Sequence, residues 1–170
     1  MFRKSFISFV AFVAAFASIA AFAPQVATAD DEPTENARTV FKYLKNRDYK
    51  ADYDSDGDIV FEYENKYYLI VFDDDDDAYF RIIYANFYTL DDTAELALAC
   101  LVAHRVNSTV KGVKVLVPEK FVENPKRIFD APAIAVESFH MDASAFARSI
   151  PRSVLALQTA AKRFSEEMGD

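Results

Sequence analysis

The sequence predicts an α+β domain: an antiparallel five-stranded sheet with helices mainly on one face, in the order α-β-β-β-α-β-β-α. Two observations support this class. Runs rich in β-branched and aromatic residues are separated by short polar gaps, which is typical of hairpins. Stretches with apolar residues every three or four positions precede, interrupt and follow these runs, which indicates helices.

Residues 1–29 are predicted to be a secretory signal peptide. Arg3 and Lys4 give a basic start, an apolar run follows over residues 6–23, and Ala27-Thr28-Ala29 has the small-residue pattern of a cleavage site. We expect cleavage between Ala29 and Asp30, which leaves residues 30–170 as one exported domain, periplasmic or secreted. An uncleaved membrane anchor is the alternative, since the apolar run is close to the length that spans a bilayer.

The net charge restricts the expected partners. The whole chain has 19 Lys+Arg and 27 Asp+Glu. The leader contains Arg3 and Lys4 but no acid, so its removal leaves 17 basic against 27 acidic residues, a net charge near minus ten. Such a surface repels polyanions, and we therefore expect neither nucleic acid nor, after leader cleavage, a membrane as a partner.

The first helix and the first three strands follow from local patterns. Pro33 suits the first turn of a helix that ends near Asn46-Arg47-Asp48 and has an apolar stripe of Ala37, Val40, Phe41 and Leu44. The strand-like runs are DIVFEYE (58–64), YYLIVF (67–72) and AYFRIIYANFY (78–88). The gaps between them are Asn65-Lys66 and the run Asp73 to Asp77, so we expect an antiparallel meander.

The second half of the chain continues with a helix over DDTAELALACLVAHRVN (91–107), capped by Asp91 or Asp92. Its middle is apolar on nearly all sides, which predicts a central, covered helix with Cys100 as a small core residue; a reactive thiol is the alternative. Strands are predicted at VKVLVP (113–118) and AIAVESF (133–139). A terminal helix follows, in which Pro151 either kinks the helix or starts a second one.

These elements together resemble the YbjN-like family and, through it, the type III secretion chaperone-like fold. The similarity covers about Asn36 to Met168. It depends on the acidic turn Asp54-Ser55-Asp56-Gly57-Asp58, the aromatic hairpins after it and the acid-capped helix LDDTAELALACLVAHRVN. The resemblance implies a non-enzymatic protein-interaction module. A cytosolic role is not carried over, because the leader predicts export.

The stretch DYDSDGDIVFEY (52–63) raises the question of calcium. Counted from Asp52, the first, third and fifth positions of an EF-hand loop are Asp52, Asp54 and Asp56, and Gly57 is sixth. Position 12 is Tyr63, where a bidentate Glu is required, and a strand follows in place of a helix. We therefore interpret Asp56-Gly57 as a turn. A cation site using Asp52, Asp54, Asp56 and Asp58, with Asp73 to Asp77, is the alternative; a solvated loop is favoured for that second run.

No catalytic or metal-ligating pattern stands out, and the chain is expected not to be an enzyme, to have no catalytic, cofactor-binding or metal site residues, and to need no cofactor. His104 and His140 have no ligand-type neighbours at metal-binding spacing. Neither a Gly-x-Ser-x-Gly nucleophile motif nor a glycine-rich phosphate loop is present. The two histidines are interpreted as structural.

The predicted strands are apolar on both faces. Phe80, Ile82, Tyr84 and Tyr88 share one side of the third strand, and Tyr79, Ile83, Ala85 and Phe87 share the other with Arg81. The second strand divides in the same way into Tyr67, Leu69, Val71 and Tyr68, Ile70, Phe72. Helices of this domain cover one face, so the other, aromatic face is expected to bind a protein partner or to form a homodimer. A helix of the same chain that covers this second face, or tyrosines left half-exposed, is the alternative. The sequence thus predicts an exported chaperone-like or regulatory interaction module; a periplasmic cation-responsive protein is the alternative.

Overall fold

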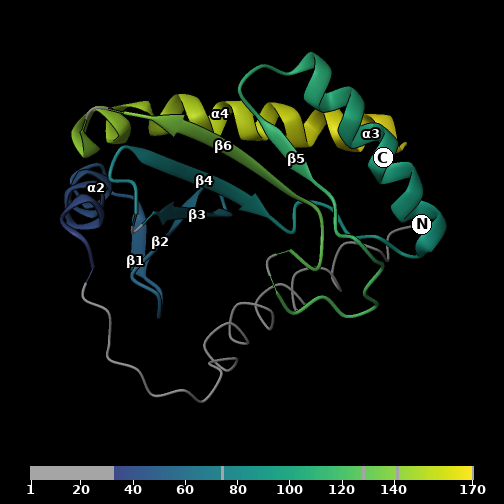
Figure 1. Ribbon diagram of the computed structural model, residues 1–170, viewed down its shortest axis with the longest axis horizontal. Helices are drawn as coiled ribbons and strands as arrows, with labels where there is room; N and C mark the ends of the chain where they lie inside the picture. Colours follow the sequence, from purple (N-terminus) through teal and green to yellow (C-terminus); the bar gives the residue numbers. More distant parts are fainter. Residues whose placement is uncertain (1–32, 74, 128, 141, 170) are drawn as a thin grey trace.

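The computed structural model describes residues 33–73, 75–127, 129–140 and 142–169. The predicted leader and its cleavage site between Ala29 and Asp30 lie outside these residues. The described part of the chain forms three helices and six strands: α2 (Glu35–Lys45), β1 (Lys50–Tyr53), β2 (Ile59–Tyr63), β3 (Lys66–Phe72), β4 (Tyr79–Ala85), α3 (Thr93–Thr109), β5 (Lys114–Leu116), β6 (Ala133–Phe139) and α4 (Ala143–Met168). The α+β class is confirmed (Figure 1).

The sheet is antiparallel throughout and has the strand order β1-β2-β3-β4-β6-β5. The prediction of five strands was wrong, because β1 pairs with β2 through the partners Ala51↔Phe61 and Tyr53↔Ile59. The element order therefore has four consecutive strands, not three, before α3. The sequence KADY of β1 is too short and polar to resemble the runs that follow it, and only its pairing with β2 makes it a strand.

Polar side chains cap the described helices. The Thr34 Oγ1 accepts from Ala37 N (3.1 Å), the Asp92 Oδ1 from Glu95 N (2.8 Å) and the Asp142 Oδ1 from Ala145 N (2.7 Å). Each bond satisfies an amide that has no partner inside its helix. Asp92, one of the two predicted caps, is the N-cap of α3. Pro33 precedes the cap of α2 and is not in its first turn.

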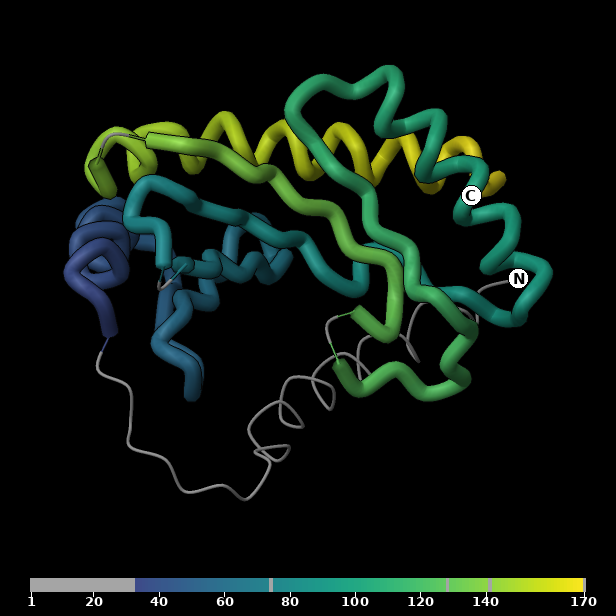
Figure 2. Tube along the Cα trace, in the orientation of Figure 1, coloured from purple at the N-terminus to yellow at the C-terminus, as the bar shows by residue number. Residues whose placement is uncertain are grey.

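The three helices pack on one face of the sheet. Figure 1 shows α4 running along the sheet, with α2 at one end and α3 at the other. Pro151 neither ends α4 nor starts a new helix, since the helix is continuous from Ala143 to Met168. The connection between β5 and β6 extends beyond the end of the sheet away from α2 (Figure 2).

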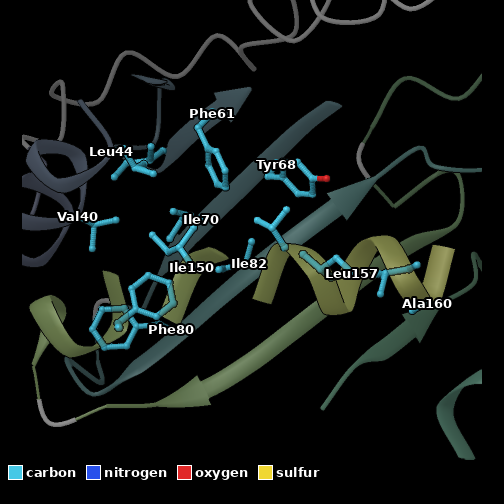
Figure 3. Packing of buried hydrophobic residues seen from close by; sticks show 14 of the residues in the cluster. Val40, Leu44, Phe61, Tyr68, Ile70, Phe80, Ile82, Ile150, Leu157 and Ala160 are labelled. Carbon is cyan, nitrogen blue, oxygen red and sulfur yellow. The ribbon is translucent and has the colours of Figure 1, made fainter. Parts of the chain in front are cut away.

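The core lies between the sheet and these helices (Figure 3). Phe61 and Tyr68, on neighbouring strands, stack with centroids 5.2 Å apart. Full burial of a large apolar side chain stabilises the folded state by about 1.5–3 kcal/mol. The labelled side chains, each at most 1 % exposed, are Val40, Leu44, Phe61, Tyr68, Ile70, Phe80, Ile82, Ile150, Leu157 and Ala160.

The position of α3 corrects two predictions. The helix is not central, because only one side of it is buried, and that side consists of Leu96, Ala99, Val102, Ala103 and Val106. On the other side Leu98 and Leu101 are exposed. Cys100 is also exposed and is not a core residue. The helix contacts α4 and β5 at the end of the helical layer, and no other described element covers its outer side.

The third predicted strand was too long. Asn86 has a φ of 53°, in the left-handed region, and β4 ends before it. Phe87 and Tyr88 consequently leave the sheet, and both rings contact Phe164 of α4, with centroids 5.1 and 5.4 Å from it. The assignment of these two residues to opposite faces of a strand was therefore wrong.

Candidate functional site

The side of the sheet away from the helices, here called the second face, is the candidate interaction surface. Strand side chains alternate between the two faces, so the register of the strands determines its members. Its central row runs Asp52, Val60, Leu69, Ile83, Ala135, Lys114 across the six described strands. The next row runs Lys50, Glu62, Tyr67, Ala85, Ala133, Leu116.

The centre of the second face is apolar, but it is not open. Ile83 is 1 % exposed, and Ala133 and Ala135 are 0 % exposed. Half-buried Leu69, Val71, Ala85 and Leu116 pack against these three residues. The expectation of a broad exposed aromatic face is therefore wrong for the middle of the sheet, where small and aliphatic side chains form a second, minor core.

Charged residues surround this centre. Glu137 of β6 pairs with Arg81 Nε (3.2 Å) and with Lys114 Nζ (3.8 Å), so it joins β4, β6 and β5. At the opposite edge, Lys50 Nζ lies 3.1 Å from a carboxylate oxygen of Glu62. The prediction that the second face lacks polar residues holds for β3 and, apart from Arg81, for β4, but the outer strands and β6 contribute charges. Such exposed pairs contribute little to stability and are suited to selecting a partner.

An exposed aromatic pair lies at one end of the second face. Tyr79 and Phe139 are opposite each other on β4 and β6, with ring centroids 5.3 Å apart. The side chain of Phe139 is 73 % exposed, more than any other large apolar side chain in the described residues. Arg81 donates from Nε and Nη2 to the hydroxyl oxygen of Tyr79 (3.2 and 2.7 Å), which fixes the Tyr79 ring. An oriented aromatic pair beside an arginine is the composition of an interface anchor.

A shallow groove lies at the other end of the sheet, beside the edge strand β1. It has a volume of about 410 Å³ and includes Tyr49, Lys50, Val60, Glu62 and Tyr67 in its lining. The β1 strand has a neighbour on only one side in the sheet. An edge of this kind can accept a further strand from another polypeptide.

The stretch that resembles a calcium loop forms the turn between β1 and β2. The Oδ1 atom of Asp54 accepts from the amides of Asp56 and Asp58, both at 3.0 Å. Gly57 has a φ of 80°, the left-handed conformation that glycine adopts most easily. Burial raises the pKa of Asp54 above its ordinary value, although the two amide hydrogen bonds act to lower it. This geometry matches the interpretation as a turn.

The other acids of this stretch also bind protein groups. The Oδ1 atom of Asp58 accepts from Phe72 N on β3 (3.0 Å), and that of Asp52 accepts from Tyr53 N (3.0 Å). Tyr63, at the position where calcium requires a bidentate Glu, ends β2. Among the described residues, no group of three or more His, Cys, Asp or Glu side chains is arranged to hold a metal ion.

The second acidic run, Asp73 to Asp77, forms the β3–β4 hairpin tip, of which residue 74 is not described. Asp73 Oδ1 accepts from Asp75 N (2.9 Å), and Asp76 Oδ1 accepts from Ala78 N (2.9 Å). Asn36, in the first turn of α2, donates from Nδ2 to the Asp77 carbonyl (3.0 Å). This bond places the backbone of Asp77 next to the first turn of α2. The described residues of the tip form an exposed loop.

The two histidines do not approach each other. His104 is exposed on α3, and its carbonyl accepts from Ser108 Oγ (2.8 Å). His140 follows β6 at the opposite end of the sheet from α3 (Figure 1), where its ring lies 5.6 Å from that of Phe146. The interpretation of the two histidines as structural stays a prediction.

Comparisons with known proteins support the fold and carry no functional information. No protein-family model matches the chain, and no curated protein matches it. One similar solved structure is that of an uncharacterized protein from Methanothermobacter thermautotrophicus, with a TM-score of 0.51 and 15 % sequence identity over 79 % of this chain and 99 % of that one. The similarity shows a shared α+β fold. Within the described residues, none of the helices has the length and apolarity needed to cross a membrane.

Proposed function

We propose that the protein is an exported, non-enzymatic interaction module that binds a segment of another protein on the second face of its sheet, with Phe139 and Tyr79 as anchors. The main observation that supports this proposal is the exposure of Phe139, whose side chain is largely in contact with solvent. A phenylalanine buries a large apolar area on binding, and leaving it in water is unfavourable. Its contact with the Tyr79 ring restricts the side chain in the unbound protein, which lowers the entropy lost on binding.

The remainder of the second face supports the same role. Arg81 donates to Tyr79, and Glu137 pairs with both Arg81 and Lys114, so charges of both signs close to the aromatic pair favour a partner of mixed charge. The edge of β1 offers backbone groups for strand addition. A homodimer through this same face would bury the same anchors, and the experiment below separates it from binding of another protein.

The finer assignment follows the resemblance noted in the sequence. We propose a YbjN-like domain with a type III secretion chaperone-like fold over residues 30–170, released into the periplasm or medium by cleavage after Ala29. The extra strand β1 departs from the expected order, and its position at a sheet edge leaves the rest of that topology intact. A chaperone-like or regulatory role agrees with an anchor that is exposed in the unbound chain.

The test is quantitative capture of periplasmic proteins by the exported protein and by its Phe139→Asp variant. We expect at least one protein whose recovery falls about tenfold in the variant, because a charge at an anchor prevents burial. Phe129→Asp is the matched control, since Phe129 is also exposed (52 %) but lies in the β5–β6 connection. Equal recovery by all three proteins contradicts the proposal. A Phe139-dependent dimer without a captured protein indicates the homodimer instead.

A further inference from the structure

A polar groove lies in the helical layer, where the C-terminal halves of α3 and α4 meet. Figure 1 shows α3 crossing α4 near the C-terminal end of α4. The groove has a volume of about 480 Å³. Its lining residues are all polar, and none belongs to the second face: His104, Arg105, Ser108, Thr109, Arg163 and Glu167.

Glu167 lies between the two arginines of this groove, and its side chain is 15 % exposed. Its Oε1 atom accepts a hydrogen bond from Arg163 Nε (2.8 Å). Its Oε2 atom is 3.7 Å from Arg105 Nη1, which is an ion pair but is too long for a hydrogen bond. Within the described residues, this Oε2 atom is buried and accepts no hydrogen bond. A buried carboxylate oxygen without a donor is unfavourable, so it is suited to accept from a bound molecule.

The groove is positively charged in an acidic protein. Arg105 and Arg163 bring two positive charges against the one negative charge of Glu167, whereas the whole chain has a net charge of -8. A guanidinium has five N–H donors, so each arginine keeps donors for a second partner after its contact with Glu167. The two side chains are 70 % and 52 % exposed, so a ligand can reach them. His104, also exposed, offers a further donor.

We propose that this groove binds inorganic phosphate in its protonated, hydrogen phosphate forms. Arg105 and Arg163 donate to the charged oxygens of the anion, and Glu167 Oε2 accepts from its O–H group. Paired arginines suit phosphate because their N–H groups match the geometry of an oxyanion. The site is in the helical layer and does not depend on the proposed function of the second face.

Glu167 determines which anion the groove accepts. Sulfate and phosphate are tetrahedral anions of similar size, but at neutral pH sulfate carries no proton. The carboxylate of Glu167 repels sulfate, whereas it accepts a hydrogen bond from hydrogen phosphate. A phosphomonoester is also mostly without a proton at neutral pH, because its second pKa is about 6. The repulsive group therefore gives selectivity for inorganic phosphate over both, since specificity depends on what a site rejects as well as on what it attracts.

The experiment is calorimetric titration of the exported protein with phosphate, arsenate and sulfate at neutral pH and constant ionic strength. We expect a dissociation constant for phosphate on the order of 0.1–1 mM, and binding of sulfate about tenfold weaker or less. Arsenate, which also carries a proton, should bind as phosphate does. Arg163→Gln and Arg105→Gln should each weaken phosphate binding about tenfold. Arg152→Gln is the matched control, because Arg152 is also exposed on α4 but does not line the groove.

Glu167→Gln tests the selectivity directly. The glutamine can still accept from Arg163 through its amide oxygen, but it no longer repels an anion. We expect sulfate to bind this variant more tightly than wild type, so that the preference for phosphate falls to about onefold. Thermal unfolding checks that each variant is folded.

Four outcomes overturn the proposal. The first is the absence of phosphate binding by wild type at concentrations well above the expected dissociation constant. The second is equal binding of phosphate and sulfate by wild type, which indicates a non-selective cationic surface. In the third, Glu167→Gln keeps the wild-type preference for phosphate. In the fourth, Arg152→Gln weakens binding as much as Arg163→Gln does, which places the anion outside the groove.

Discussion

The rings of Phe80 and Phe146 stack with their centroids 4.3 Å apart and their planes at 13°. This contact joins β4 to the first turns of α4, and both side chains are 0 % exposed. Phe139 lies on the neighbouring strand β6 and is 73 % exposed, so the two phenylalanines differ completely in burial.

Replacing each of these phenylalanines by alanine should separate stability from binding. Phe80→Ala leaves a cavity in the core and is expected to reduce the free energy of unfolding by about 3–5 kcal/mol. Phe139→Ala removes a ring that is already in water, and we expect a change within about 0.5 kcal/mol. Urea denaturation measures both. A large loss of stability in Phe139→Ala would show that this ring is structural and would argue against its role as an anchor.

Calcium should not stabilise the protein, since the carboxylates of Asp54 and Asp58 already accept backbone hydrogen bonds. We expect the melting temperature to be equal with chelator and with millimolar calcium. The substitution Asp54→Ala should reduce the free energy of unfolding by about 1–2 kcal/mol with and without calcium, because two backbone amides lose their acceptor. Asp56→Ala is the control, as its exposed Oδ1 accepts only from the neighbouring Ser55. A calcium-dependent rise that both substitutions abolish would establish the cation-responsive alternative.

Local patterns in the sequence predicted most of the fold. The strands β2, β3 and β6 and the three described helices were found because each has a clear period and end signals such as Asp92. The strand β1 was missed because its four residues have no such pattern and depend on pairing with Phe61 and its neighbours. Pairing between distant segments is not encoded in a local period.

The exposure of individual residues was harder to predict than the elements. The sequence of α3 is apolar around most of its circumference, and only its position at the end of the helical layer shows that Leu101 and Cys100 are exposed. The face to which Phe139 belongs follows from the alternation in β6, but the placement of Tyr79 opposite it requires the register. The alternation Ala133, Ala135, Glu137, Phe139 was the signal that could have marked Phe139.

Export with leader cleavage predicts a mature protein that begins at Asp30. We expect its intact mass to match residues 30–170, and Ala29→Phe to block cleavage because leader peptidases require a small residue there. Ala21→Phe, within the apolar run, is the control and should be processed normally. Full-length wild type in the membrane fraction would instead support the uncleaved anchor.

The buried Tyr68 should make stability depend on alkaline pH. Burial raises its pKa from 10.0 to about 12, although the hydrogen bond from Gln158 acts to lower it; the nearby Tyr84 and Glu64 raise it further. Gln158 Nε2 lies 3.1 Å from the Tyr68 hydroxyl oxygen and also 3.1 Å from Glu64 Oε2. In the unfolded chain the phenol ionises near its ordinary pKa. Between these two values the folded state therefore holds the proton that the unfolded state has lost.

Stability must then fall as pH rises from about 10 to about 12, because the unfolded state binds fewer protons in that range. The contribution of Tyr68 is present in full below pH 10, and we expect about 1–2 kcal/mol of it to be lost by pH 12. Tyr68→Phe removes this titration while Tyr49, Tyr53 and Tyr84, whose pKa values burial also raises, remain as an internal reference. Urea midpoints of both proteins from pH 9 to the highest pH at which folding is reversible should converge as pH increases. Parallel curves would mean that the Tyr68 hydroxyl is exposed to water.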